Sequence, residues 1–266
     1  MAPGFALTFD DDYVSEWHGL RPLLARHDTR ATFFVTRPHR LAPSACAQLH
    51  ELAADGHEIG AHGYEHRGVL RHYGGDASRV EAWEREELLA CRDALQAMGF
   101  APTSFAFPYG EHAPAYVERA RRHFRLLRLI GSKRPFVPVS LHRRVFRRPE
   151  ALSAAQGAMI LDDLFGPTLD QLRRLLRMAS DRGWVLCFFA HKPGQVDPAH
   201  TAPDDDAAYR ISPERLERVL AEAQALGLRS YTASELAWDP LSTFQFSSGW
   251  GDGSAALSRP SSRARR

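Results

Sequence analysis

The sequence is poor in cysteine, and this scarcity excludes two kinds of protein. Its 266 residues contain three cysteines, Cys46, Cys91 and Cys187, which are widely separated and form no CxxC pair. An odd number at such spacing argues against a disulfide framework and against a cysteine-rich zinc site.

Long apolar runs and a leader-like start are also missing. No apolar run reaches the roughly 20 residues that are needed to span a bilayer. The first ten residues, MAPGFALTFD, have neither the basic nor the apolar region of a signal peptide, and strand-like sequence begins by Phe5. These absences predict a cytoplasmic protein without a transmembrane segment, an expectation that a longer N-terminus would overturn.

Lysine is nearly absent, so the positive charge comes almost entirely from arginine. Lys133 and Lys192 are the only lysines, and 34 basic residues against 32 acidic ones give a net charge of +2. This balance excludes a uniformly basic nucleic-acid binder. The charge is unevenly spread, because segment 119–148 holds eleven arginines and lysines and no acidic residue. We interpret this segment as a solvated helix face with a basic loop or as a surface for an anionic ligand.

Short apolar runs alternate with helical patterns along the chain. The runs typical of buried strands are 5–9, 31–36, 57–61, 104–107, 124–130, 184–190 and 228–232. Apolar residues at helical spacing predict helices over 15–27, 44–55, 78–98, 114–123, 168–182 and 213–226. Such alternation is typical of βαβ units in a parallel sheet or barrel. We predict irregular structure over 132–160 and a disordered tail over 241–266, where serine, glycine and arginine accumulate.

Carboxylates and imidazoles follow several of these strands. The acidic run 10–12 follows the first strand, His62 and His66 follow the third, and His191 follows the strand 184–190. Functional groups in parallel α/β barrels collect at the carboxyl ends of the strands. We therefore expect these side chains to share one rim.

Asp11, His62 and His66 form a competent ligand set for a divalent metal ion. Three protein ligands leave a fourth position open for water, as a catalytic site requires. The two histidines can face one ion if a helical turn begins at His62. Each feature alone is weak evidence, since HxxxH pairs and acidic turns are common on protein surfaces.

The order of these motifs resembles that of the polysaccharide deacetylases, the carbohydrate esterase family with the NodB homology domain. The segments similar to its first three motifs are TFDD (8–11), GHEIGAHGYEH (56–66) and FAFPYG (105–110), and the run into His191 is similar to the fifth. The resemblance covers roughly residues 5–240. It implies one domain over 1–240 with a distorted (β/α) barrel of seven or eight parallel strands.

The resemblance implies a metal centre and a base. Asp11, His62 and His66 would hold one divalent ion, zinc in most of the family. Asp10 would be the general base that takes a proton from the attacking water.

The resemblance also assigns the groups that handle the leaving group and the substrate. The backbone N–H of Tyr109 would stabilise the oxyanion, and His191 would protonate the departing amine. Phe107 and Phe189 are candidate substrate contacts. Phe189 stands where the family usually has a leucine that lines the acyl pocket, and the alternative for it is a place in the core.

Several positions depart from the family pattern. Asp12 stands in place of glycine, and Gly63 stands in place of a serine or threonine that steadies the loop. The motif-three arginine that pairs with the base is Ala106 here. We predict that another arginine replaces it, drawn from Arg143, Arg144, Arg147 and Arg148. The aspartate that supports His191 is expected to be Asp162 or Asp163.

These residues favour a metal-dependent hydrolase that removes an N-acyl group, acetyl above all, from an amino sugar or glycan precursor. The basic segment 119–148 would suit a substrate on an anionic lipid or nucleotide carrier, and no nucleic-acid partner is expected. Two alternatives remain: a non-sugar amide hydrolase similar to allantoinases, and a glycan-binding pseudoenzyme.

Overall fold

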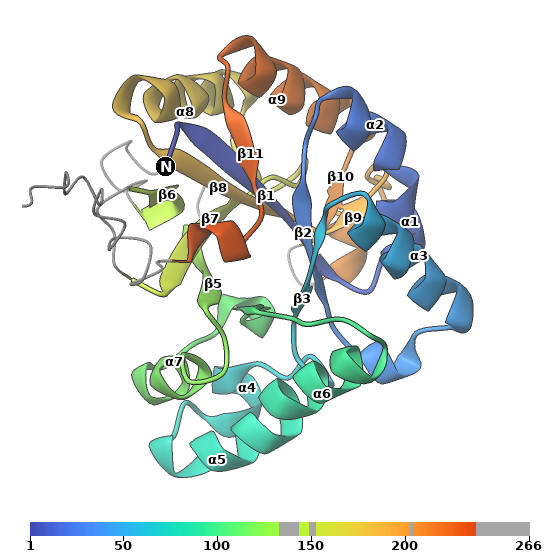
Figure 1. The fold of residues 1–266 in the computed structure, drawn as a ribbon, viewed down its shortest axis with the longest axis vertical. Helices are drawn as coiled ribbons and strands as arrows, with labels where there is room; N and C mark the ends of the chain where they lie inside the picture. The colour runs from blue at the N-terminus through green and yellow to red at the C-terminus, as the bar shows by residue number, and fades with distance from the viewer. Residues whose placement is uncertain (133–143, 149–152, 203–204, 238–266) are drawn as a thin grey trace, which may run out of the picture.

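Seven parallel strands form a closed barrel at the centre of the molecule (Figure 1). The computed structural model describes residues 1–132, 144–148, 153–202 and 205–237. Around the ring the strands are β1 (Gly4–Asp11), β2 (Ala31–Val35), β3 (Glu58–Ala61), β4 (Ser104–Ala106), β5 (Leu126–Ser132), β7 (Ala155–Ile160) and β8 (Val185–Ala190). Pairing of β8 with β1, with Phe5 opposite Leu186, closes the ring. The predicted barrel of seven or eight strands is confirmed.

The described residues form four further short strands outside the ring. β11 (Arg229–Tyr231) runs parallel to the first residues of β1, and β6 (Phe146–Arg147) runs antiparallel to β8. β9 (Lys192–Pro193) and β10 (Arg210–Ile211) form a separate parallel pair just beyond the end of β8. The strand expected over 228–232 therefore exists but is not one of the seven that close the ring.

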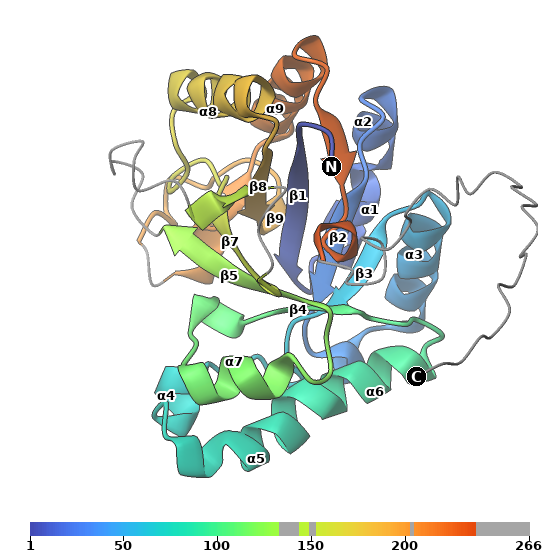
Figure 2. The same ribbon diagram turned by 60° about the vertical axis from the view of Figure 1, so that its left-hand side comes forward.

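Helices cover the outside of the barrel. They are α1 (Val14–Gly19), α2 (Arg21–Arg26), α3 (Pro43–Ala54), α4 (Val69–Tyr73), α5 (Val80–Trp83), α6 (Ala90–Ala97), α7 (Pro114–Ala120), α8 (Leu169–Arg182) and α9 (Pro213–Ala225). A π-helical segment, η3 (Glu84–Leu89), joins α5 to α6, and the 3₁₀ turns are η1 (Pro38–Arg40), η2 (Ala77–Arg79), η4 (Pro108–Gly110), η6 (Asp206–Ala208) and η7 (Ser234–Leu236). Helices α8 and α9 pack together, while α4 to α7 gather at one end of the molecule (Figures 1 and 2). In the described part of the chain, no helix has the length and apolar character to cross a membrane.

The alternation of side chains along β1 explains how the barrel separates two apolar clusters. Phe5, Leu7 and Phe9 belong to the larger cluster between the strands and the helices. Ala6 belongs to the smaller cluster inside the ring, and Asp10 shares its parity and points the same way, because successive strand residues face opposite sides. The first carboxylate of the acidic run therefore faces the barrel interior.

Three sequence predictions need correction. Strand β7 lies within 132–160, where irregular structure was expected. Its sequence AQGAMI has few β-branched residues and so gives a weak strand signal. Its glycine, Gly157, stands where a Cβ would lie 2.5 Å from the carbonyl oxygen of Arg144. The helix expected over 15–27 is two helices, α1 and α2. The helix expected over 78–98 contains the π-helical segment η3. The tail 241–266 lies outside the described residues.

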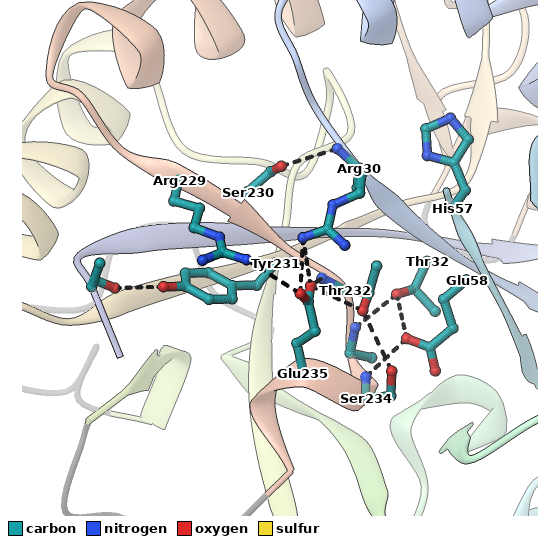
Figure 3. A network of polar contacts seen from close by, with 12 residues as sticks. Arg30, Thr32, His57, Glu58, Arg229, Ser230, Tyr231, Thr232, Ser234 and Glu235 are labelled. Atoms are coloured by element: carbon teal, nitrogen blue, oxygen red, sulfur yellow. Dashed lines mark hydrogen bonds and ion pairs between the residues drawn. The ribbon is translucent and has the colours of Figure 1, made fainter. Parts of the chain in front are cut away.

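A partly buried polar network lies at the amino-terminal end of the barrel (Figure 3). The Glu58 carboxylate accepts hydrogen bonds from the Thr32 hydroxyl at 3.1 Å, the Ser104 hydroxyl at 2.6 Å and the Ser234 N–H at 2.8 Å. Glu235 accepts from the Arg30 guanidinium at 2.9 Å. These hydrogen bonds hold the segment after β11 against this end of the ring. The opposite, carboxyl end of the strands is left for the candidate site.

Candidate metal centre and catalytic site

Asp11, His62 and His66 converge at the carboxyl ends of β1 and β3. Asp11 Oδ1 lies 3.3 Å from His66 Nε2 and 3.7 Å from His62 Nε2, and the two Nε2 atoms lie 3.2 Å apart. Ligand atoms around a tetrahedral zinc ion, with bonds of about 2.0–2.1 Å, are roughly 3.3 Å from one another. The three donor atoms therefore have the spacing that one divalent ion requires.

The protonation states of the three side chains also fit a cation. His62 Nδ1 lies 2.9 Å from the Ala106 carbonyl oxygen, to which it donates, so its Nε2 lone pair faces Asp11. Burial lowers the pKa of His66 to about 2 and that of His62 well below its usual range, so both rings are neutral donors. Burial raises the pKa of Asp11, and the opposing effect of the nearby His191 is smaller, so that the pKa is about 7. A divalent cation would stabilise the ionised form of this carboxylate.

The two histidines meet through an irregular loop, 62–67, which we call the ligand loop. The helical turn expected at His62 is wrong. Gly63 has φ +89°, and His66 adopts a left-handed φ of +62°. Asp11 at +92° and Tyr109 at +57° share this rare conformation. Non-glycine residues of this kind cost roughly 1–3 kcal/mol each. Backbone strain is thus concentrated at the rim that carries the candidate ligands.

The predicted base, Asp10, is paired with an arginine that the sequence prediction missed. The Arg128 guanidinium on β5 forms a buried ion pair and hydrogen bond with Asp10 Oδ2, and both residues are only 2% exposed. Asp10 Oδ1 is buried and has no hydrogen-bond partner. Arg128 stands directly opposite Ala106 in the β4–β5 pairing. The guanidinium missing from motif three is therefore supplied by the neighbouring strand.

The prediction that Arg143, Arg144, Arg147 or Arg148 would fill this role is wrong for the described residues. Arg147 donates to the Ser153 carbonyl oxygen at 2.6 Å, and Arg148 lies 5.9 Å from the Trp184 ring. The Arg144 carbonyl accepts from Gln156. Arg143 lies outside the described residues. The signal that could have identified Arg128 is a charge between two leucines, Leu127 and Leu129, within the strand expected over 124–130.

His191 at the end of β8 is held by Asp162, one of its two predicted partners. Asp162 Oδ2 lies 2.5 Å from His191 Nδ1, and Oδ1 accepts the His191 backbone N–H at 3.1 Å. The Trp17 indole N–H donates to the His191 carbonyl at 3.1 Å. Asp163 instead accepts the backbone N–H of Ser212. The aspartate on Nδ1 leaves Nε2 as the ring nitrogen available for chemistry.

The charge on His191 is set by its carboxylate neighbours. Burial alone would lower its pKa, but Asp162, through charge and hydrogen bond, and then Asp11 and Asp10 outweigh burial and raise the pKa to about 9. His191 is therefore protonated at neutral pH. A protonated imidazole that lines the same cavity as Asp10 can act as a general acid.

The three candidate metal ligands, Asp10 and His191 all line one cavity of about 510 Å³. Phe189 and the ring of Tyr109 also line it, and the Tyr109 ring centre lies 4.5 Å from that of His66. Phe107 does not line it: it is fully buried and stacks on Trp83 at 5.7 Å in the outer core, so its predicted role as a substrate contact is wrong. Even-numbered residues of β4 face the barrel interior, and Phe107 has the opposite parity.

The basic segment 119–148 is not one uninterrupted cationic surface. Arg119 pairs with Glu84 at 2.8 Å and Arg121 with Glu118 at 2.9 Å. Arg128 is buried against Asp10. Acidic groups from elsewhere thus neutralise part of this charge, which favours the solvated-face interpretation for the described arginines.

The molecule is a closed parallel α/β barrel, and its carboxylates and imidazoles gather at the carboxyl ends of the strands. Enzymes with such barrels carry their active sites at this end. Sequence comparison then shows a match to one family over part of the chain. The profile described as "Polysaccharide deacetylase" matches residues 2–124, which include the first three motifs. This match confirms the resemblance to the polysaccharide deacetylases that the motifs indicated, over the amino-terminal part of the chain.

Individual relatives are distant. The uncharacterized protein YlxY of Bacillus subtilis (strain 168) is 28% identical over 170 residues, which cover 62% of this chain and 49% of YlxY, so the match spans about half of that relative. A family 4 acetyl xylan esterase from Clostridium thermocellum, solved with a cobalt ion, has a TM-score of 0.51 at 18% identity and covers 87% of this chain and 89% of its own. The chitin deacetylase of Colletotrichum lindemuthianum has a TM-score of 0.53 at 16% identity, with coverage of 90% and 89%. These structures share the barrel fold.

Proposed function

We propose that the protein is a divalent-metal-dependent hydrolase that removes an N-acyl group, acetyl above all, from an amino sugar or glycan. The observation that carries this proposal is the convergence of Asp11, His62 and His66 within 3.7 Å of one another, beside Asp10 and His191 in one cavity. The match of residues 2–124 to the polysaccharide deacetylase profile and the cobalt ion in the acetyl xylan esterase of the same fold support it.

Asp11, His62 and His66 would hold the ion, for which zinc is the proposed identity. A divalent ion there supplies Lewis acidity, which lowers the pKa of water and polarises an acyl carbonyl. Asp10, with its free and buried Oδ1, would accept a proton from the attacking water, and the ion pair with Arg128 would hold the carboxylate in place. The Tyr109 N–H would donate to the developing oxyanion.

His191 would complete the reaction by giving its proton to the departing nitrogen. An amine leaving as an anion is a poor leaving group, so a protonated acid is essential to amide cleavage. Asp162 keeps His191 charged and fixes the direction of its ring. Phe189 would form an apolar wall for the acyl group.

The test is amine release from N-acetylated amino sugars, both free and linked to anionic carriers, measured with the metal-loaded protein. Amine release that requires a divalent ion and is lost in Asp10→Asn would support the proposal. A metal-loaded protein that binds these sugars and releases no amine would refute it and favour the pseudoenzyme alternative. Release from non-sugar amides alone would favour the allantoinase-like alternative.

A further inference from the structure

A buried carboxylate from outside the family motifs underlies the ligand loop. Glu87 lies on the π-helical segment η3 and is fully buried. Its Oε2 accepts the backbone N–H groups of Glu65 at 3.1 Å and Arg67 at 3.2 Å, and its own carbonyl accepts the Tyr64 N–H at 3.2 Å. The loop backbone on both sides of His66 is therefore bonded to one side chain.

Glu87 also occupies the space that a side chain at position 63 would need. A Cβ on Gly63 would lie 2.9 Å from Glu87 Oε2, and the Gly63 φ of +89° itself disfavours a side chain. On the opposite side, the Gly63 carbonyl accepts the Thr36 hydroxyl at 2.9 Å and the Arg37 N–H at 3.2 Å. The loop is thus held between β2 and the helix that carries Glu87.

The position of Glu87 in its helix is unusual for a charged residue. Val80, Trp83, Cys91 and Leu95 form the buried face, and Glu87 falls four residues from both Trp83 and Cys91, in the middle of that face. Burying a carboxylate there costs free energy unless it is hydrogen-bonded. The two N–H donors from the ligand loop supply those bonds to Oε2, and the Arg67 guanidinium lies 3.8 Å from Oε1, which has no hydrogen-bond partner. π-Helical turns of this kind are frequent at functional sites.

We propose that Glu87 is a positioning residue of the metal centre. Its carboxylate fixes the backbone around His66 so that His66 Nε2 meets Asp11 and His62 at ligand spacing. It takes over the loop-steadying task that Gly63, lacking a hydroxyl, does not perform. This inference rests on the proposed function only in requiring that the centre bind a divalent ion.

Metal affinity and the cobalt spectrum of the full chain test this role. Zinc affinity is measured by competition with a chelating dye, and the absorption spectrum of the Co²⁺-loaded protein reports ligand geometry. Glu87→Ala should weaken zinc binding by about 10–100-fold and alter the Co²⁺ spectrum, because partners that orient metal ligands contribute on this scale. Glu87→Gln keeps an oxygen acceptor and should stay close to wild type.

Glu84→Ala is the matched control. Glu84 lies on the same segment η3 but binds Arg119 at 2.8 Å and His123 at 2.6 Å, away from the ligand loop. It should lower stability without changing zinc affinity or the Co²⁺ spectrum. If Glu87→Ala does not fold, Glu87→Asp takes its place in the test. This variant shortens the side chain by one methylene, moves the acceptor away from the loop, and should also weaken zinc binding.

Wild-type zinc affinity and Co²⁺ spectrum in a folded Glu87→Ala or Glu87→Asp protein would overturn the inference. So would an equal loss of affinity in Glu84→Ala, since that would reveal a general effect of the helix. A wild-type protein that binds no divalent ion would overturn both this inference and the proposed function. Metal binding that depends on Glu87 without any amine release would refute the proposed function alone.

Discussion

Replacing Arg128 with methionine tests whether Asp10 depends on an arginine supplied by β5. Both residues are 2% exposed, so removing the guanidinium leaves a buried carboxylate without its countercharge. Breaking a buried ion pair from one side typically costs about 3–5 kcal/mol. Methionine is chosen because Arg128 also packs against the rings of Phe189 at 4.7 Å and Phe34 at 5.7 Å, and an unbranched chain keeps that volume filled.

The assay is denaturant unfolding at neutral pH in a double-mutant cycle with Asp10→Asn. We expect Arg128→Met to lower the free energy of unfolding by about 3–5 kcal/mol in the wild-type background. In the Asp10→Asn background the loss should be less than half as large, because no carboxylate is then left uncompensated. An equal loss in both backgrounds would refute the ion-pair reasoning and assign Arg128 a packing role.

The same pair allows a relocation test. Ala106 stands directly opposite Arg128, and neighbouring strands are about 4.8 Å apart, so an arginine at either position can reach Asp10. The double change Ala106→Arg with Arg128→Ala should therefore recover part of the stability and amine release that Arg128→Ala loses. No recovery in either measurement would show that the strand of origin matters and would contradict the equivalence of the two positions.

Three further predictions concern single side chains. Gly63→Ser should not repair the second motif but should destabilise the metal-free protein by about 1–3 kcal/mol, because of its φ of +89° and its contact with Glu87; unchanged thermal unfolding would contradict this. Asp162→Asn should lower the pKa of His191 from about 9 to below its ordinary value, and an NMR titration of the metal-free protein that still gives about 9 would oppose the assignment. Because the pKa of His191 is raised on folding, its contribution to stability is complete below about pH 6.5 and is lost as the pH rises to about 9, and Asp162→Asn should remove this pH dependence. Phe107→Ala should cost about 3–5 kcal/mol of stability while leaving KM unchanged, and a raised KM with intact stability would restore its predicted role.

The rim of the site could be predicted because it follows from strand ends. Asp11, His62 and His191 each come directly after a short apolar run, and the parallel arrangement brings such ends together. The same logic predicted His66, but not the loop conformation that turns it toward Asp11. A left-handed backbone at a histidine depends on tertiary packing, which sequence spacing does not contain.

The roles of Arg128 and Glu87 could not be predicted, because the residues that they contact lie far from them along the chain. Arg128 reaches Asp10 across the interior of the ring, from a strand that is not adjacent to β1. Periodicity identifies the face on which a residue lies, but not the residue opposite it in a closed barrel. For Glu87 the sequence did contain a signal, because a carboxylate lies in the centre of an apolar helical face. Strand β7 was missed for the simpler reason that AQGAMI has weak strand propensity.

The first strand of the barrel has consequences for how the nascent chain folds. β1 pairs with β2 but also with β8 and β11, so Gly4 stands opposite both Val185 and Arg229 in register. Ribosomes add about 5–20 residues per second, so β1 emerges on the order of ten seconds or more before β8 is available to it. During that interval the apolar strand edge that carries Asp10 is without its final partners. The candidate site can form only after the ring closes, and the period before closure is when chaperones would be most needed.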